Sequence, residues 1–329
     1  MPTIEDIAKI AKVNKSTVSK ALKNSGDLNK ETARRIRKIA VELGYEKHFR
    51  KGAVNKILGI VCPEIDDAFY SQMINGLARR AETEGYKCVI LSDNFDFVAE
   101  KECVAYLTEK NVAGIFIVNA EVLNDYDFSE IVKECNVPIV RVSADRNNDV
   151  CDNIWINEKA GIEDAIEHLI ALGHSKIAFV GDCYGKFRLA CLKESMQERG
   201  LIFDEGMCFL GSRRFDSGFM GIKQLLSSGK KFTAVFAQYD DVALGAIKAL
   251  REEGLSVPDD VSVIGFDDAH YCDFINPALT TINSKVENLC EIAFALLKKK
   301  ICGKGGAVQY VLVKPELVIR QTTAKVSKQ

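Results

Sequence analysis

The chain has 329 residues, of which 47% are hydrophobic and 27% are charged, and its formal net charge is -2. Its longest apolar runs, such as ILGIVC, are far shorter than the roughly 20 residues that cross a bilayer. Its eleven cysteines include no C-x-x-C pair, which argues against a disulfide framework and a zinc site. We therefore expect a cytoplasmic globular protein of two or three domains, with no membrane segment, metal or cofactor.

The charge is unevenly distributed along the chain. Residues 1–56 contain 14 Lys and Arg against 6 Asp and Glu, a net charge of +8, and the remaining 30 basic and 40 acidic residues give -10. A basic head on an acidic body favours a module that binds a polyanion. A solvated lysine face is the alternative that charge alone leaves open.

Three short helices are predicted in the head. Thr3 and Asp6 have the spacing of a capping box, and the apolar residues that follow recur on one helical face. Asn14 is placed to cap a second helix, which turns Val18 inward and leaves Lys and Ser side chains outward. Asn29 is placed to cap a third, and Gly44 closes it. Three small helices around one apolar cluster indicate a helix-turn-helix.

The outer face of the second helix suits DNA. Lysines and helix N-termini neutralise phosphates, whereas short side chains at the start of a helix reach base edges in the major groove. We expect base-edge contacts from Lys15, Ser16 and Lys20. The side chains expected on the DNA backbone are Thr3, Asn14, Thr17, Ser19, Asn24 and Arg34.

The string TIEDIAKIAKVNKSTVSKALKNSG, with LNKETARRIRKIAVELGY after it, resembles the DNA-binding head of the lactose-repressor/galactose-repressor (LacI/GalR) family of bacterial transcription regulators. The resemblance implies that the second helix is the recognition helix. Lys20 stands where the family usually has Arg, and Lys lacks the planar fork that grips guanine. The segment after Tyr45 is shorter than in the family and lacks its A-x-S-L hinge, whose Leu enters the minor groove. Either Phe49 or Val54 replaces that wedge, or the segment is a flexible basic linker.

In the body, short β-rich runs alternate with amphipathic helical stretches, which favours parallel sheets covered by helices on both faces. Polar residues follow these runs, at the strand ends that line the ligand crevice of doubly wound folds. Two sheets that open toward each other would form a cleft suited to a polyhydroxylated ligand. The runs span residues 57–62, 87–92, 113–118, 137–142, 176–181, 233–238 and 261–266.

The body also resembles this family, through GIVCPEIDDAFYSQMINGL, HLIALGHSKIAFVGD, AVFAQYDDVALGAIKALREEGLSVPDDVSVIGFDD and INPALTTI. The implied fold is α/β: a three-helix helix-turn-helix head and a periplasmic-binding-protein-like body of two doubly wound parallel-sheet subdomains. Crossovers are expected near 152–154, 282–285 and 312–315. The resulting division is 1–46 for the head, 47–56 for a linker, 57–152 with 284–312 for the N-subdomain, 153–283 with 313–323 for the C-subdomain, and 324–329 for a tail.

The resemblance also implies an effector site between the subdomains. Arg188 and Asp267 match the family's polar clamp, and Arg213 aligns where relatives stack an aromatic ring on the ligand. Together with Arg188, Arg213 would bind an anion through its planar guanidinium group. A one-residue slip in the alignment would put Arg214 at this position instead. A surface ion pair between Arg213 and Asp216 is an equally open alternative. The expected effector contacts are Phe69, Tyr70, Asn119, Arg188, Arg213, Tyr239 and Asp267.

Two other functions compete with regulation. A sugar-binding protein without a DNA role would lack the head. No G-x-x-x-x-G-K-[ST] or G-x-G-x-x-G follows a strand, so a nucleotide site of either type is unsupported. The acidic pairs that follow strands suggest a metal-assisted sugar or phosphoryl enzyme, but the resemblance implies a role without catalysis for each of those positions. We therefore expect no catalytic residues. The sequence predicts a homodimeric repressor that binds a pseudo-palindromic operator under allosteric control by a sugar or sugar phosphate, which either releases it or holds it on DNA.

Overall fold

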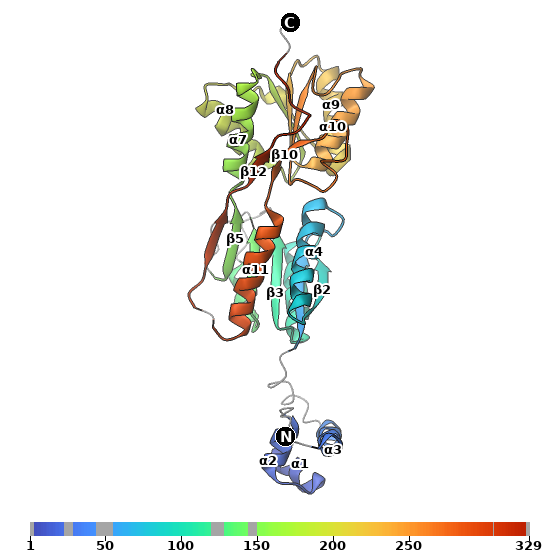
Figure 1. Cartoon of the computed structure of the whole chain (residues 1–329), viewed down its shortest axis with the longest axis vertical. Coiled ribbons are helices and arrows are strands. Elements are labelled where there is room, and N and C mark those ends of the chain that lie inside the picture. Colours follow the sequence, from blue (N-terminus) through green and yellow to red (C-terminus); the bar gives the residue numbers. More distant parts are fainter. Residues whose placement is uncertain are drawn as a thin grey trace.

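The computed structural model describes residues 3–22, 29–43, 55–119, 128–143, 150–304 and 306–326. These ranges form a helical head and a body of two α/β subdomains, the second drawn above the first in Figure 1. Within them, no helix combines the length and the apolar character that a membrane crossing requires. The fold class expected from the sequence is confirmed.

The head contains three helices, α1 (Ile4–Ala11), α2 (Lys15–Leu22) and α3 (Lys30–Glu42). The predicted capping box is present: the Thr3 side chain accepts from the backbone N–H of Asp6, and the Asp6 carboxylate accepts from that of Thr3. Their inward residues form one cluster in which Ile7, Val18 and Ile36 are fully buried. Apolar spacing along each helix therefore fixes which of its faces points outward. Gly44 lies outside the described residues.

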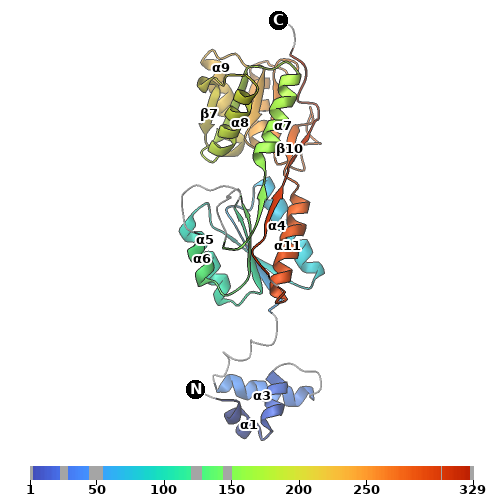
Figure 2. The ribbon, with the colours of Figure 1, turned by 90° about the vertical axis from the view of Figure 1, so that its left-hand side faces the viewer.

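The first subdomain is a parallel sheet of order β11-β5-β4-β3-β1-β2 between two helical layers. Figure 2 shows α5 and α6 on one face of the sheet and α4 and α11 on the other. Strands covered on both faces are apolar throughout, and β3 is buried along its whole length. The strands are β1 (Ile57–Cys62), β2 (Lys87–Ser92), β3 (Gly114–Asn119), β4 (Ile139–Ser143), β5 (Asp152–Ile156) and β11 (Tyr310–Val313); the helices are α4 (Ala68–Thr83), α5 (Phe97–Glu109), α6 (Ser129–Glu134) and α11 (Val286–Ile301).

The second subdomain repeats this plan with the sheet order β12-β10-β9-β8-β6-β7, parallel except for β12. Helices α7 and α8 cover one face, and α9 and α10 cover the other. The strands are β6 (Ile177–Asp182), β7 (Cys208–Gly211), β8 (Ala234–Ala237), β9 (Ser262–Phe266), β10 (Thr280–Asn283) and β12 (Glu316–Val318); the helices are α7 (Glu158–Ala171), α8 (Lys186–Glu198), α9 (Arg214–Ser227) and α10 (Asp240–Glu252), with a short 3-10 turn at Glu205–Met207.

Three chain segments connect the subdomains, after β5, after β10 and between β11 and β12. The first differs from the boundary drawn at residue 152, because β5 remains in the first sheet as far as Ile156. It pairs in parallel with both β4 and β11, and these hydrogen bonds hold it there. The crossover therefore lies at Asn157, whose side chain caps α7.

Helices α9 and α10 pack at backbone contact. A Cβ at Gly218 would lie 1.9 Å from the carbonyl oxygen of Val242, and one at Gly245 would lie 2.0 Å from that of Phe215. Only glycine permits this approach. It positions the N-terminal ends of both helices at the edge of the second sheet that faces the first subdomain.

Candidate nucleic-acid interface and ligand cleft

Helix α2 has one buried face and one exposed polar face. Val18 and Ala21 are buried in the head cluster, whereas Lys15, Ser16 and Lys20 are exposed. The remaining predicted contacts of this helix, Asn14, Thr17 and Ser19, are exposed or half-buried. The helix therefore presents short donors and cations on the side opposite its packing face.

Lys15 and Thr3, both predicted DNA contacts, have partners inside the head. The Lys15 ammonium forms an ion pair with Glu5 of α1, in which both side chains are more than half exposed. The Thr3 hydroxyl donates to the Asp6 carboxylate at 2.7 Å as part of the capping box. Exposed ion pairs contribute little to stability, so Lys15 can exchange Glu5 for another acceptor at small cost. Asn24, Phe49 and Val54 lie outside the described residues, as does the side chain of Arg34, a residue of α3.

In the body, side chains that follow strands of both sheets meet at the junction of the two subdomains, which is called the cleft below. The Asp67 carboxylate caps α4 by accepting from the backbone N–H groups of Phe69 and Tyr70, which holds both rings at the start of that helix. The Tyr70 and Phe95 ring centroids are 6.2 Å apart, and Phe95 stacks on Tyr184 of the second subdomain at 4.3 Å. Aromatic side chains of both subdomains thus form one continuous wall.

Arg188, near the start of α8, is the centre of a buried polar cluster. Its guanidinium donates to Glu158 Oε1 and to the carbonyl oxygen of Gln238, each at 2.6 Å, and lies 3.8 Å from Asp267 Oδ1. It also lies 3.7 Å from the centroid of the Phe266 ring. Burial by itself lowers the pKa of Arg188, but the neighbouring carboxylates outweigh it and raise that pKa well above its usual range.

Asp267 is held in place by backbone geometry and hydrogen bonding. Its φ is +102°, its backbone N–H donates to the carbonyl of Ile282, and its carboxylate accepts from the Ser284 hydroxyl at 2.9 Å. Burial raises the pKa of Asp267 to about 7, and Arg188 opposes that rise. A carboxyl group that titrates near neutrality can both accept from and donate to ligand hydroxyls.

Arg213 and Arg214 come from the N-terminal end of α9. Arg213 donates to Asp182 Oδ2 at 2.7 Å and pairs with Glu64 of the first subdomain; Arg214 pairs with Glu64 at 3.0 Å and with Asp66 at 2.9 Å. Burial lowers the pKa of each guanidinium, but neighbouring groups raise that pKa by more: Tyr239, Asp182 and Glu64 at Arg213, and carboxylates alone at Arg214. Both arginines contact the first subdomain. Whichever of the two aligns with the aromatic position of the relatives, a guanidinium group therefore lies in the cleft.

The structure brings six of the seven predicted effector contacts into one chain of neighbours. Arg213 lies 5.9 Å from the ring centroid of Tyr239, which lies 5.0 Å from Arg188. The seventh, Asn119, ends β3 in the first subdomain, where its amide donates to Glu100 of α5 at 3.3 Å. Because Glu100 is buried, that amide satisfies a carboxylate that would otherwise be costly to bury.

Sequence reasoning missed Glu64, Phe95, Tyr184 and Glu158. Glu64 follows the end of β1 by two residues, and Tyr184 follows the end of β6 by the same interval. The rule that ligand groups follow strand ends would have found these two. Asp240, by contrast, is structural: its carboxylate accepts from the Ala269 backbone N–H at 2.7 Å and from the Thr281 hydroxyl.

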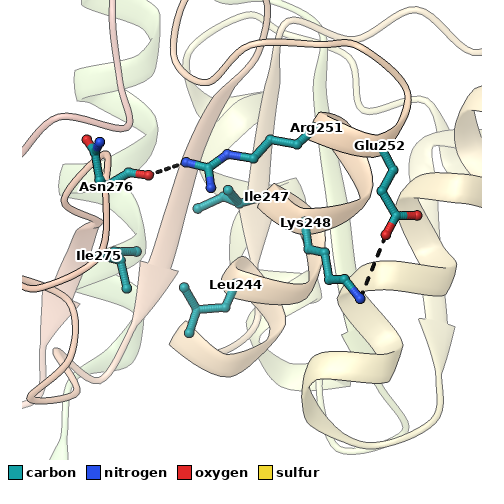
Figure 3. Close-up of a pocket in the computed structure, with 7 residues that line it drawn as sticks. All are labelled: Leu244, Ile247, Lys248, Arg251, Glu252, Ile275 and Asn276. Atoms are coloured by element: carbon teal, nitrogen blue, oxygen red, sulfur yellow. Dashed lines mark hydrogen bonds and ion pairs between the residues drawn. The ribbon is translucent and has the colours of Figure 1, made fainter.

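A pocket of about 620 Å³ lies on the outer surface of the second subdomain, along α10 and the loop after β9. Figure 3 shows Leu244, Ile247 and Ile275 as its apolar side chains, with Arg251 donating to the carbonyl of Asn276. None of the predicted effector contacts lines it. It is therefore a feature of the outer face, separate from the cleft.

Within the described part of the chain, no group of three or more His, Cys, Asp or Glu side chains is arranged to hold a metal ion. The carboxylates of the cleft are paired with arginines, with hydroxyls or with backbone N–H groups.

Comparisons with known proteins match both parts of the chain. Residues 3–47 match the family described as bacterial regulatory proteins, lacI family, and residues 166–323 match a periplasmic binding protein-like domain. The HTH-type transcriptional regulator DegA of Bacillus subtilis (strain 168) is 30% identical over 331 residues, covering 98% of each chain. The HTH-type transcriptional repressor PurR of Vibrio campbellii is 26% identical, covering 99% of this chain and all of PurR.

A solved structure of the lac repressor dimer, bound to operator and the anti-inducer ONPF, has a TM-score of 0.77 and 26% identity to this chain. The match covers 98% of this chain and 99% of the repressor chain. Each of these matches therefore spans both the head and the body, in the same order along the chain.

Proposed function

The chain belongs to the lacI family of bacterial regulatory proteins, and from this premise we propose which residues read DNA and which class of effector the cleft binds. It is a sequence-specific DNA-binding transcriptional regulator whose curated relatives are regulators and repressors. We propose that it acts as a repressor in the cytoplasm and catalyses no reaction.

The observation that carries the DNA proposal is the two-sided character of α2, with Val18 buried and three donors exposed. In the proposal, Lys15, Ser16 and Lys20 contact base edges. The proposed DNA-backbone contacts are Thr3, Asn14, Thr17, Ser19, Asn24 and Arg34, with Phe49 at the minor groove. Lys15 exchanges Glu5 for DNA when it binds.

Single alanine substitutions of Lys15, Ser16 and Lys20 test this assignment. Each is expected to cost about 1–3 kcal/mol on the selected operator and to relax the preference at particular base pairs. The measurement is a binding titration against a randomised operator library at fixed salt, with Lys9→Ala of α1 as the matched control. Equal weakening on every sequence would leave these residues with phosphate contacts alone.

We propose that two copies associate through one side of the body. The α10 surface carries the apolar pocket of Figure 3, and Phe274 in the adjoining loop is 86% exposed. On the first subdomain, the edge strand β2 exposes Val89 and Ile90, and Figure 1 shows β2 and α10 on the same side of the molecule. A two-fold interface there would place two heads on a pseudo-palindromic operator. Sedimentation of Phe274→Asp tests this: a variant that remains dimeric refutes it.

The effector that the cleft fits best is a neutral sugar. Phe69, Tyr70 and Phe95 form its aromatic side, and Asp267, beside Arg188, offers carboxylate oxygens to hydroxyls. A phosphate would have to displace Glu64 and Asp182 from Arg213, because both arms of that guanidinium are already paired with carboxylates. We therefore favour a sugar over a sugar phosphate.

Control by the effector follows from linkage. A ligand that binds both subdomains favours one relative orientation of them, and that orientation sets the spacing of the heads, so DNA and effector change each other's affinity by the same factor. A thermal-shift screen of sugars identifies the ligand, and calorimetry on matched sugar and sugar-phosphate pairs then tests its charge. Tighter binding of the phosphate would refute the neutral-sugar proposal and leave the regulator function intact.

A further inference from the structure

Side chains of the two subdomains contact each other directly across the cleft. Glu64, in the loop after β1, accepts from both Arg213 and Arg214 of the second subdomain. Arg214 also donates to the backbone carbonyl of Asp66 at 3.0 Å and to its carboxylate at 2.9 Å. Phe95 of the first subdomain also stacks on Tyr184 of the second.

Glu64 is the residue at which the ionic contacts converge. Its side chain is 19% exposed, and those of Arg213 and Arg214 are 30% and 16% exposed, so the cluster is partly shielded from solvent. Partly buried charges are screened by salt less than exposed ones, and a carboxylate shared by two guanidinium groups accepts strong, charge-assisted hydrogen bonds. The cluster can therefore contribute more than an ordinary surface ion pair.

The second subdomain holds the two arginines ready for this contact. Asp182, fully buried at the end of β6, fixes Arg213 from its own subdomain, and Asp241 Oδ2 lies 3.9 Å from Arg214 Nη1. Arg214 itself has a φ of +59°, a left-handed conformation that is uncommon outside glycine, at the first residue of α9. The backbone turn and the flanking carboxylates together aim both guanidinium groups at the first subdomain.

We propose that Glu64 is the hub of an ionic latch, formed with Arg213 and Arg214, that closes the two subdomains while no effector is bound. The effector then enters a cleft that is already biased toward closure, and it competes with Arg213 for the space beside Phe95 and Tyr184. Ionic strength is a second input to the closed state, because salt weakens the latch and leaves hydroxyl contacts to a neutral ligand largely unchanged.

The Phe95–Tyr184 stack provides a probe of closure that needs neither effector nor DNA. The full chain, which has nine tyrosines, is labelled with 3-fluorotyrosine, and Tyr184→Phe identifies the Tyr184 resonance in the fluorine NMR spectrum. Phe95→Leu removes the neighbouring ring and so provides the reference shift for an unstacked Tyr184. At about 10 mM salt, where the Debye length is about 30 Å, the wild-type shift is expected to differ from that reference.

Glu64→Gln keeps the shape of the side chain and removes its charge. It is expected to raise the open-to-closed ratio roughly five- to thirty-fold, the factor that a loss of one or two kcal/mol produces, and to move the Tyr184 shift toward the reference. Arg214→Met is a second route to the same result. Raising salt toward 1 M, where the Debye length is about 3 Å, moves the wild-type shift in the same direction.

Lys223→Gln is the matched control, because Lys223 pairs with Glu252 and Glu253 within the second subdomain. It leaves the Tyr184 shift unchanged, and the other tyrosine resonances report whether each variant is folded. Two results overturn the latch: a wild-type shift equal to the reference at low salt, or a shift that neither substitution nor salt alters. Neither result bears on the proposed regulator function, since the experiment contains no operator and no sugar.

Discussion

Replacing Arg188 with methionine removes a buried charge while keeping most of the side chain's volume. In the native chain this guanidinium donates at 2.6 Å both to Glu158, which is 4% exposed, and to the carbonyl of Gln238. Methionine can still pack on Phe266 but supplies no donor. Breaking a buried ion pair from one side costs about 3–5 kcal/mol, since the remaining carboxylate keeps its desolvation penalty. We expect the free energy of unfolding of the body to fall by that amount.

The loss should also depend on pH. Burial already raises the pKa of Asp267 to about 7 even though Arg188 lowers it, so removing Arg188 raises that pKa further. A carboxyl group whose pKa is higher in the folded state contributes its full stability below the unfolded pKa and loses it as pH rises through the folded value. The deficit of Arg188→Met is therefore expected to be larger at pH 8 than at pH 5.

Urea unfolding followed by circular dichroism measures both effects. Arg199→Met is the control, because Arg199 ends the same helix but lies 3.9 Å from an exposed Glu167, and such a pair is worth less than about 1 kcal/mol. The double variant Arg188→Met with Glu158→Leu should recover part of the loss, as apolar replacement of both partners removes the buried charge. Equal losses at Arg188 and Arg199, or no recovery in the double variant, would refute the reasoning.

Three further predictions concern the interior. Burial raises the pKa of Asp240 to about 8. The free energy of unfolding of the wild type should therefore fall between pH 5 and pH 8.5, and that of Asp240→Asn should fall less. An equal change in melting temperature with pH in the two proteins would contradict this. Gly218→Ala places a Cβ 1.9 Å from the carbonyl oxygen of Val242 and should lower the free energy of unfolding in urea by about 1–3 kcal/mol or more. Ser227→Ala, at the exposed end of α9, is the control and should lower it by less than about 0.5 kcal/mol. Ile36→Ala should remove about 2–5 kcal/mol from the small head, so operator binding in gel shifts is lost while the melting temperature of the body stays unchanged.

The sequence by itself determined the local structure of this protein. The spacing of Thr3 and Asp6 predicted the first helix and its cap, and apolar runs predicted β1, β2 and β6 to within a residue. Uneven charge and the donors of α2 indicated a DNA-binding head before any fold was known. These signals are readable because each depends on residues a few positions apart, where chain geometry is fixed by one helix or one strand.

Only the tertiary structure decided which side chains share the cleft. Arg213 was expected to bind an anion or to pair with Asp216, and it is paired instead with Asp182 and with Glu64, 149 positions away. Asn119 was assigned to the ligand and is held by Glu100. No periodicity encodes such pairs, because they form only when elements that are distant in the sequence come together in the folded chain. The partner of a buried charge is then set by distance and desolvation.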